Sequence, residues 1–204
     1  TSQNVISPSP AESENTNSEV TKILFLAANP KNTSRLRIGE EFREIEEKIR
    51  LSKFRDQFQF TTKWAVRVPD IMQALLDVEP NIIHFAGHGE EDGIQVEDVN
   101  GFPQTIPKEA LALLFSEFSE SIRCVVLNAC LSEEQGHEIA KNISYVVGTN
   151  KEIGDKSSIA FSVGFYQALG AKKEFDQAFR LGQIAIALQG LSGKDIPVLI
   201  KKED

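Results

Sequence analysis

The sequence lacks the features that mark membrane proteins and nucleic-acid-binding proteins. No apolar run approaches the ~20 residues that a membrane-spanning helix needs. Acidic residues outnumber basic ones, 30 to 22, and the formal charge of −8 argues against a nucleic-acid-binding surface. We therefore expect neither nucleic acid nor a membrane among its partners. The chain starts at Thr1 without a signal-peptide pattern, which suggests a piece of a longer polypeptide.

Cysteine is scarce as well, with only Cys124 and Cys130. On one extended strand, six steps of ~3.3 Å would put their Cα atoms ~20 Å apart, whereas a disulfide tolerates ~7 Å. The two thiols therefore cannot pair with each other, and free thiols predict a reducing, cytoplasmic location. An unpaired cysteine in a chain that also contains histidines is a candidate nucleophile.

The remaining composition is that of a globular protein with a tail. With 204 residues, 41% of them hydrophobic, the chain is long enough for one domain with its own core. Residues 1–21 are rich in Ser, Asn, Thr, Glu and Pro and contain no aromatic residue. Such a segment buries little apolar surface, so we predict a disordered tail or linker over 1–21 and a globular domain over 22–204.

Apolar runs alternate with amphipathic stretches along the globular part. Continuous or alternating apolar runs predict strands, and apolar residues that recur every three or four positions predict helices. The predicted strands are 22–28, 58–64, 82–86, 124–127, 145–149 and an edge strand at 198–200. The predicted helices are 36–51, 69–77, 107–118, 157–169 and 174–188, with one more after Ser132. This alternation indicates a doubly wound, mostly parallel α/β sheet of about five to six strands, with helices on both faces.

Three local patterns give finer predictions. Asn100-Gly101 between two short runs predicts a small β-hairpin with a type I′ turn. Ser132, followed three residues later by Gln135, predicts a capping box. In the helix over 36–51, the glutamates are expected to form the solvated face: Glu40, Glu41, Glu44, Glu46 and Glu47.

Two predicted strands end in residues that can carry chemistry. The run 82–86 is followed by His88 between Gly87 and Gly89, and the run 124–127 is followed by Cys130. In doubly wound sheets, functional groups gather beyond the carboxyl ends of the strands. Adjacent strands lie ~4.8 Å apart, so the two side chains can meet if these strands are neighbours.

A thiol and an imidazole at one sheet edge suit nucleophilic catalysis. The imidazole raises the thiolate fraction of the cysteine and can later protonate a leaving amine. The helix that follows Cys130 adds a favourable field for a thiolate. The backbone N–H groups of Gly89 and Cys130 could stabilise the oxyanion of a tetrahedral intermediate. We therefore predict Cys130 as nucleophile and His88 as general base and acid.

Other interpretations of the same residues remain open. From spacing alone, a cysteine at a strand end is more often a small buried hydrophobe, and Cys124 is expected in the core. His84, in mid-strand, is expected to be a core or supporting histidine, and His137 to lie on the surface. His84 and His88 lack the intervening glutamate of a helical zinc pair, and the sequence shows no phosphate-binding loop, so we expect no metal and no cofactor. A non-catalytic α/β interaction module is the alternative function.

The motifs also resemble a known family. His84-Phe-Ala-Gly-His88-Gly89 and the later Val125-Val-Leu-Asn-Ala-Cys130 occur in the order found in the CHAT domain. CHAT domains are caspase-like cysteine peptidases of the clan that holds caspases, separase and gingipains. The segment 23–30 is similar to the family's opening, and Gly154-Asp155 with 165–169 is similar to its closing segment. The resemblance implies a caspase-like, flavodoxin-like fold with the small hairpin beside the site.

The resemblance also implies roles and partners. His88 is the implied base and acid, Cys130 the nucleophile, and the Gly89 amide part of the oxyanion hole. Asp155 matches an acidic residue that lines a pocket for a basic substrate side chain in separase-like members, although it equally suits the N-cap region of the following helix. Asn128 stands where metacaspase-like relatives have an aspartate, so this position of the pocket is neutral. The implied function is an endopeptidase that cuts a protein partner as the effector of a bacterial defence system, activated by a sensing or adaptor domain.

Overall fold

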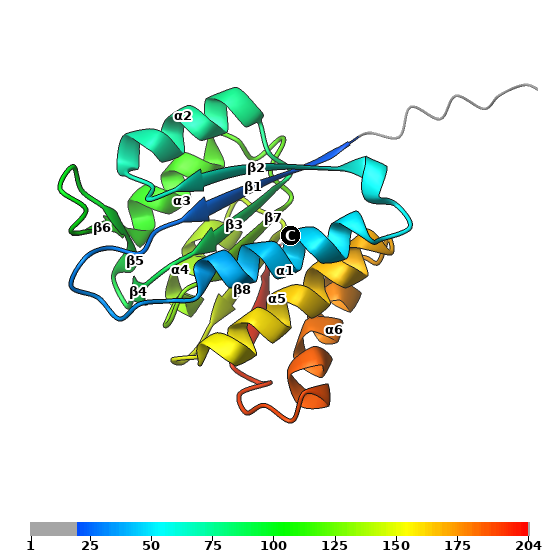
Figure 1. Ribbon diagram of the computed structural model, residues 1–204. Helices are drawn as coiled ribbons and strands as arrows, with labels where there is room; N and C mark the ends of the chain where they lie inside the picture. The colour runs from blue at the N-terminus through cyan, green and yellow to red at the C-terminus, as the bar shows by residue number, and fades with distance from the viewer. Residues whose placement is uncertain (1–19, 204) are drawn as a thin grey trace, which may run out of the picture.

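The computed structural model describes residues 20–203, and its centre is a six-stranded sheet in the order β2-β1-β3-β7-β8-β9 (Figure 1). The strands are β1 (Thr21–Ala27), β2 (Phe58–Trp64), β3 (Ile82–Ala86), β7 (Cys124–Asn128), β8 (Tyr145–Thr149) and β9 (Pro197–Lys201). All neighbours pair in parallel except β8 and β9, which are antiparallel. The predicted α/β sheet is confirmed. The tail expected over 1–21 lies, up to residue 19, outside the described residues, and β1 already includes Thr21.

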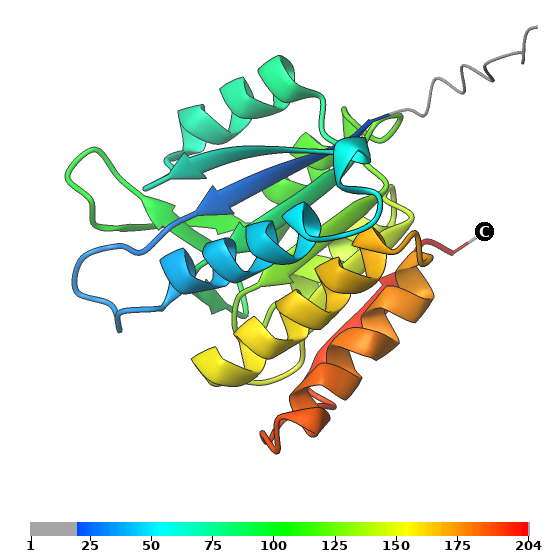
Figure 2. The same cartoon turned by 45° about the vertical axis from the view of Figure 1, so that its right-hand side comes forward.

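The helices cover both faces of this sheet. They are α1 (Ile38–Arg50), α2 (Val68–Val78), α3 (Lys108–Ser116), α4 (Glu133–Ala140), α5 (Asp155–Gly170) and α6 (Phe175–Leu188), with a short 3-10 turn over Arg55–Gln57. α1, α5 and α6 pack on one face and lie side by side in Figure 2, whereas α2, α3 and α4 pack on the other. Strands β1, β3 and β7, enclosed between the two layers, are buried at almost every residue. No helix in residues 20–203 has the length and apolar character needed to cross a membrane.

A second, small antiparallel sheet lies beside the carboxyl ends of β3 and β7. It consists of β4 (Gly89–Glu90), β5 (Gly93–Glu97) and β6 (Pro103–Pro107). The hairpin was predicted, but its type I′ turn is wrong, because Gly101 has a positive φ (80°) and Asn100 does not. Asp98 shapes a longer loop over 98–102 instead. Its carboxylate accepts the backbone N–H groups of Asn100 at 2.7 Å and Phe102 at 2.8 Å.

The predicted capping box at the start of α4 is also wrong. Ser132 is the N-cap residue, but it is fully buried, and its hydroxyl donates to the Leu127 carbonyl at 3.1 Å and accepts the Thr149 N–H at 3.0 Å. Gln135 donates its side-chain amide to the Glu90 carbonyl. Both side chains therefore join α4 to neighbouring strand ends, and tertiary contacts replace the local cap.

The contact between α5 and α6 depends on glycine at position 182. A Cβ there would lie 2.8 Å from the Phe161 ring and 2.9 Å from the Phe161 carbonyl oxygen. We expect Gly182→Ala to lower the free energy of unfolding by about 1–3 kcal/mol through overpacking, despite alanine's better helix propensity. Gly39→Ala, in α1 with open space around it, is the matched control and should be neutral or slightly stabilising. Urea unfolding of both variants measures the difference, and equal stability would contradict the overpacking argument.

Candidate active site

The register of β3 against β7 brings His88 and Cys130 to the same edge. Ala86, the last residue of β3, pairs with Asn128, the last residue of β7. His88 and Cys130 each lie two residues beyond this pair, so both follow the carboxyl ends of neighbouring parallel strands. From the sequence, we expected the two side chains to meet only if their strands were neighbours in the sheet, and they are neighbours.

The backbones stay close beyond the strand ends. The Gly87 N–H still donates to the Asn128 carbonyl at 3.2 Å, so the ladder runs one residue past β3. At Gly89 the approach is tighter, because an added Cβ would collide with the Cys130 carbonyl oxygen and lie 3.0 Å from the Ala129 Cβ. Glycine at 89 is therefore required for the close approach of the two strand ends.

Two backbone N–H groups at this edge have no hydrogen-bond partner among residues 20–203. The Gln95 N–H donates to the His88 carbonyl at 2.9 Å, so the next pair, Gly89 with Ile94, is a non-hydrogen-bonded pair of the antiparallel ladder. The Gly89 N–H consequently points away from β5. The Cys130 N–H makes no hydrogen bond within residues 20–203. These are the two donors that the sequence predicted for an oxyanion hole.

The His88 ring is oriented by a backbone carbonyl. Its Nε2 lies 2.8 Å from the Ser34 carbonyl oxygen. A carbonyl only accepts, so Nε2 carries the hydrogen, and Nδ1 of the neutral ring is left as the proton acceptor. No hydrogen bond joins the Cys130 sulfur to this ring within the described part of the chain. The structure thus places the Cys130 thiol and the His88 ring at one edge of the sheet without a hydrogen bond between them.

The loop that supplies the Ser34 carbonyl is tied to the tip of the small hairpin. The Lys31 N–H donates to the Gly101 carbonyl at 2.8 Å, and its ammonium donates to the Asn100 carbonyl at 2.7 Å. A third bond of 3.2 Å runs from the Asn29 N–H to the Glu97 carboxylate. The orientation of His88 therefore depends on contacts between two segments that are far apart in the sequence.

A pocket opens beside Cys130. Asn128 and Asp155, the two positions that the sequence singled out for a substrate pocket, both line it. Its apolar walls come from the loop before α1, from α1 itself, from the loop before α5 and from α5: Leu36, Ile38, Ile153 and Ile159. Asp155 is the first residue of α5, whose N-cap is Gly154 without a side-chain cap, so Asp155 does not act as an N-cap.

A buried polar network lies beneath this pocket, and sequence reasoning missed its centre. Glu41 is only 4% exposed, although the prediction placed it on the solvated face of α1. Its Oε1 accepts hydrogen bonds from His84 Nε2 at 3.0 Å, Asn128 Nδ2 at 2.5 Å and Ser162 Oγ at 2.7 Å. His84 Nδ1 lies 3.1 Å from the Tyr166 hydroxyl. The interpretation of His84 as a core histidine with satisfied partners is confirmed.

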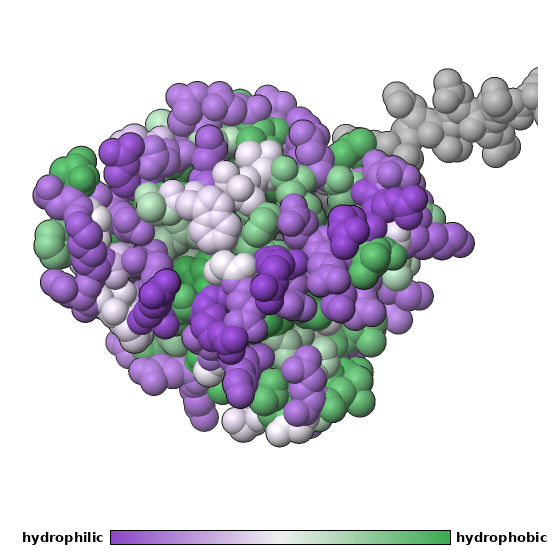
Figure 3. Space-filling model, in the orientation of Figure 1, coloured by the Kyte–Doolittle hydropathy of each residue, from purple (hydrophilic) through white to green (hydrophobic). Residues whose placement is uncertain are grey.

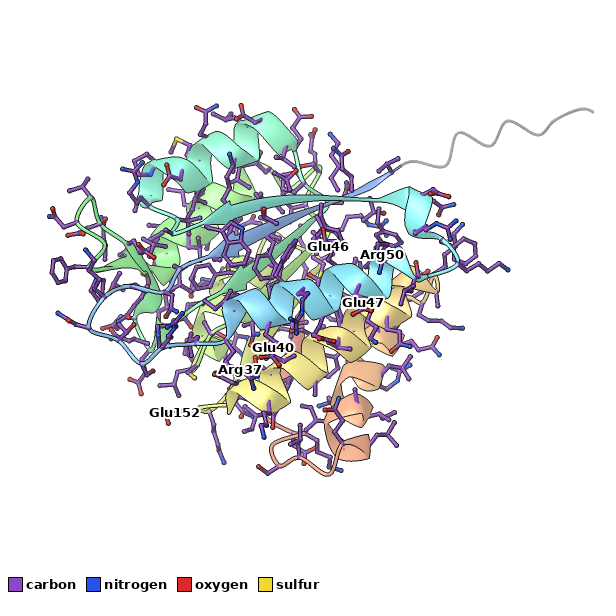
Figure 4. All side chains as sticks on the ribbon, in the orientation of Figure 1. Arg37, Glu40, Glu46, Glu47, Arg50 and Glu152 are labelled. Atoms are coloured by element: carbon purple, nitrogen blue, oxygen red, sulfur yellow. The ribbon has the colours of Figure 1, made fainter. Side chains whose placement is uncertain are left out.

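The signal that could have placed Glu41 inward is its spacing. It lies three residues after Ile38 and four before Ile45, which are both buried. The outer side of α1 is hydrophilic in Figure 3, and Figure 4 labels charged residues on that side, namely the N-cap residue Arg37 and the helix residues Glu40, Glu46, Glu47 and Arg50. The prediction of a solvated face was thus correct for the helix as a whole and wrong for Glu41.

The two cysteines differ in environment, as expected. Cys124 is fully buried in the core, and this burial raises the pKa of its thiol far above the ordinary value. Cys130 is partly exposed, lines the pocket and forms no disulfide. His137, expected on the surface, is exposed. Cys130 is therefore the thiol that a reagent or substrate can reach.

The comparisons with known proteins agree with this geometry. The family model of the CHAT domain matches residues 1–191. This chain belongs to the CHAT domain family. A "Roc-COR-CHAT protease" from Runella zeae is 26% identical to it over 151 residues, which are 72% of this chain and 16% of that protein. The CHAT chain thus spans about a sixth of the length of this curated relative.

Solved structures share the fold of this CHAT domain at low sequence identity. A secreted C11 cysteine protease from Bacteroides thetaiotaomicron, in complex with an irreversible peptide inhibitor, has a TM-score of 0.61 and 12% identity, covering 89% of this chain and 66% of that one. The Arg-specific cysteine proteinase gingipain R has a TM-score of 0.59 and 9% identity, covering 90% and 48%. The predicted caspase-like fold, with a mostly parallel sheet and a small hairpin sheet, is confirmed.

Proposed function

We propose that this CHAT domain is a cysteine endopeptidase in which Cys130 is the nucleophile and His88 the general base and acid. The observation that carries the proposal is the β3–β7 register, which places both residues two positions beyond one strand pair. The free N–H groups of Gly89 and Cys130 beside them would stabilise the oxyanion. Membership in the CHAT family supports the same activity.

The reaction follows from these positions. His88 Nδ1 takes the thiol proton of Cys130, and the sulfur attacks the carbonyl carbon of the scissile peptide bond. The negative charge on the carbonyl oxygen is stabilised by the two N–H groups as the tetrahedral intermediate forms. The C–N bond then breaks, the amine leaves with the proton held by His88, and water hydrolyses the resulting thioester. Asn128 and Asp155 line the pocket for the substrate side chain that precedes this bond.

The wider role is also part of the proposal. We infer that the domain is the effector of a bacterial defence or conflict system, that it acts on a protein substrate in the cytoplasm, and that an associated sensing or adaptor domain activates it. Two features support this: the multidomain name of the Runella zeae relative, and the small share of that protein that this chain matches. The absence of a Cys130–His88 hydrogen bond in the described residues is consistent with an inactive state awaiting a partner.

Labelling with an electrophilic peptide tests the peptidase proposal. A peptide acyloxymethyl ketone should modify Cys130 at least about 100 times faster than it modifies a free cysteine, because the oxyanion donors and the imidazole assist the attack. His88→Ala should remove this advantage while leaving the thiol in place. Cys124 should remain unlabelled until the protein unfolds, because its side chain is fully buried and this burial also raises the pKa of its thiol.

Intact mass spectrometry and peptide mapping identify the labelled cysteine. A rate at Cys130 no higher than that of free cysteine, measured with the multidomain protein and its activating partner, would favour the non-catalytic interaction module. Iodoacetamide provides the control, because it reports thiol accessibility without requiring a substrate pocket.

A further inference from the structure

The peptide group between Ala129 and Cys130 faces two sides of the site. Its N–H belongs to Cys130 and is one of the two donors proposed for the oxyanion, whereas its carbonyl belongs to Ala129. In a planar trans peptide the N–H and C=O bonds point in opposite directions, so a contact that fixes the carbonyl also fixes the N–H. The direction of this oxyanion donor is therefore set from behind, on the side away from the substrate.

A buried hydroxyl holds that carbonyl. Thr149, the last residue of β8, donates its hydroxyl to the Ala129 carbonyl oxygen at 2.7 Å. Thr149 is only 4% exposed and Ala129 only 2%, so water does not replace this contact. No second hydrogen bond reaches the Ala129 carbonyl from the described residues. Because buried carbonyls are almost always paired, this one depends on a single side chain.

The hydroxyl takes over where the pairing of the two strands stops. β8 lies next to β7 in the sheet (Figure 1), but their parallel pairs end at Val126 and Val147. Beyond this point the Thr149 N–H donates to the Ser132 hydroxyl oxygen at 3.0 Å rather than to a residue of β7. Thr149 therefore joins the end of β8 to the turn that carries Cys130 through both its backbone and its side chain.

That turn has a conformation that needs such support. Leu131, directly after Cys130, has a φ of 56°, in the left-handed region that a leucine seldom occupies. Strained residues of this kind persist only where the surrounding contacts hold them. On the far side of Leu131, the Ser132 hydroxyl donates to the Leu127 carbonyl at 3.1 Å. On the near side, the contact that fixes the turn is the one from Thr149.

We propose that Thr149 is a positioning residue of the endopeptidase: its hydroxyl fixes the Ala129–Cys130 peptide so that the Cys130 N–H faces the oxyanion. This inference rests on the proposed function, and it adds a third strand to a site built from the ends of β3 and β7. Thr149 acts through the peptide and does not touch the substrate. Its hydrogen bond also polarises the peptide, which strengthens the N–H as a donor.

A peptide aldehyde reports on the oxyanion donors directly. The Cys130 sulfur bonds to the aldehyde carbon, the thiol proton passes to His88, and the carbonyl oxygen becomes the oxyanion. Thr149→Val replaces the hydroxyl by a methyl group of similar shape. We expect it to weaken aldehyde binding about 10- to 50-fold and to lower kcat by a similar factor, with KM changed less than twofold. Thr149→Ser keeps a hydroxyl and should stay within about threefold of the unmodified protein.

Two controls separate this effect from a loss of stability. Iodoacetamide alkylation of Cys130 forms no oxyanion, so its rate should change less than twofold in Thr149→Val. Ser157→Ala removes a matched contact, in which the Ser157 hydroxyl donates to the Ser192 carbonyl at 2.8 Å, and Ser157 is 7% exposed. This second variant should bind the aldehyde as the unmodified protein does. Urea unfolding shows whether the two variants lose similar stability.

The amide resonance of Cys130 supplies a measurement that needs no substrate. Its nitrogen is bonded to the carbonyl carbon whose oxygen Thr149 contacts, so its ¹⁵N chemical shift responds to that hydrogen bond. The resonance should move in Thr149→Val, return close to its original position in Thr149→Ser and stay unchanged in Ser157→Ala.

The outcomes separate this proposal from the one it rests on. Unchanged aldehyde binding in Thr149→Val would leave the peptidase standing and contradict the role of Thr149. The role is equally wrong if iodoacetamide alkylation falls as far as aldehyde binding, or if Thr149→Ser behaves like Thr149→Val. If Thr149→Val does not fold, Thr149→Ala replaces it, and failure of both to fold would make the hydroxyl structural and overturn the proposal. If the unmodified protein neither binds the aldehyde nor cleaves any peptide, the peptidase itself falls, and an unmoved Cys130 resonance would then show separately that Thr149 does not orient the amide.

Discussion

Replacement of Cys130 by alanine should abolish peptide-bond cleavage, lowering kcat/KM by at least about 10⁴-fold, because the other thiol, Cys124, is buried in the core and cannot form the thioester. The substitution removes a partly exposed side chain at a turn, so the protein should stay folded. Cleavage of a peptide library by the wild-type protein and the variant, followed by mass spectrometry, measures the effect.

Cys124→Ala is the matched control for this prediction. Cys124 begins the strand that Cys130 follows, but it is buried in the core on the α1–α5–α6 side. Its loss should reduce the free energy of unfolding by about 1–2 kcal/mol through a small cavity and leave cleavage unchanged. Cleavage that persists in Cys130→Ala, or disappears in Cys124→Ala at full folding, would contradict the assignment of the nucleophile.

Gly89→Ala is expected to have the second largest effect, a loss of about 10²–10³-fold in kcat. The added Cβ would collide with the Cys130 carbonyl oxygen and press on Ala129, so the turn that holds the sulfur must move away from the Gly89 N–H. Loss of one oxyanion donor has this magnitude in other acyl-transfer enzymes. Iodoacetamide should still alkylate Cys130, because that reaction forms no oxyanion.

Gly154→Ala serves as the control for this substitution. Gly154 precedes α5 near the same pocket, yet a Cβ there meets nothing within 4 Å, so kcat should change less than twofold. Activity that survives Gly89→Ala would show that the close backbone approach at Gly89 is not used in catalysis. A parallel drop in iodoacetamide alkylation would instead indicate a general collapse of the site.

The sheet could be predicted from the sequence because each central strand is an apolar run of its own. The runs at 82–86 and 124–127 differ from β3 and β7 by at most one residue at their ends. The placement of His88 and Cys130 followed from the rule that parallel strands present their carboxyl ends at one edge. The sequence could not show that β3 and β7 are neighbours, because this depends on the order of all the strands in the sheet.

The misses have a common physical cause, which is that tertiary partners overrode local patterns. Glu41 follows the polar pattern of α1, but three donors from β3, β7 and α5 hold it inside. Ser132 follows the pattern of a helix cap, but the ends of β7 and β8 take its hydroxyl. Ser34, whose carbonyl orients His88, has no side-chain signature because the functional atom belongs to the backbone.

Because the hairpin holds the Ser34 loop, the orientation of His88 and the accessibility of the Cys130 thiol depend on different parts of the structure. Cys130 lies on the turn between β7 and α4, whereas the carbonyl that orients His88 is held through Lys31 by the hairpin tip. At that tip Val99 is 82% exposed. A domain that displaced the tip would remove the orienting carbonyl and leave the sulfur where it is. A resting enzyme and a working one would then carry an equally alkylatable thiol and differ only in the direction of one imidazole ring.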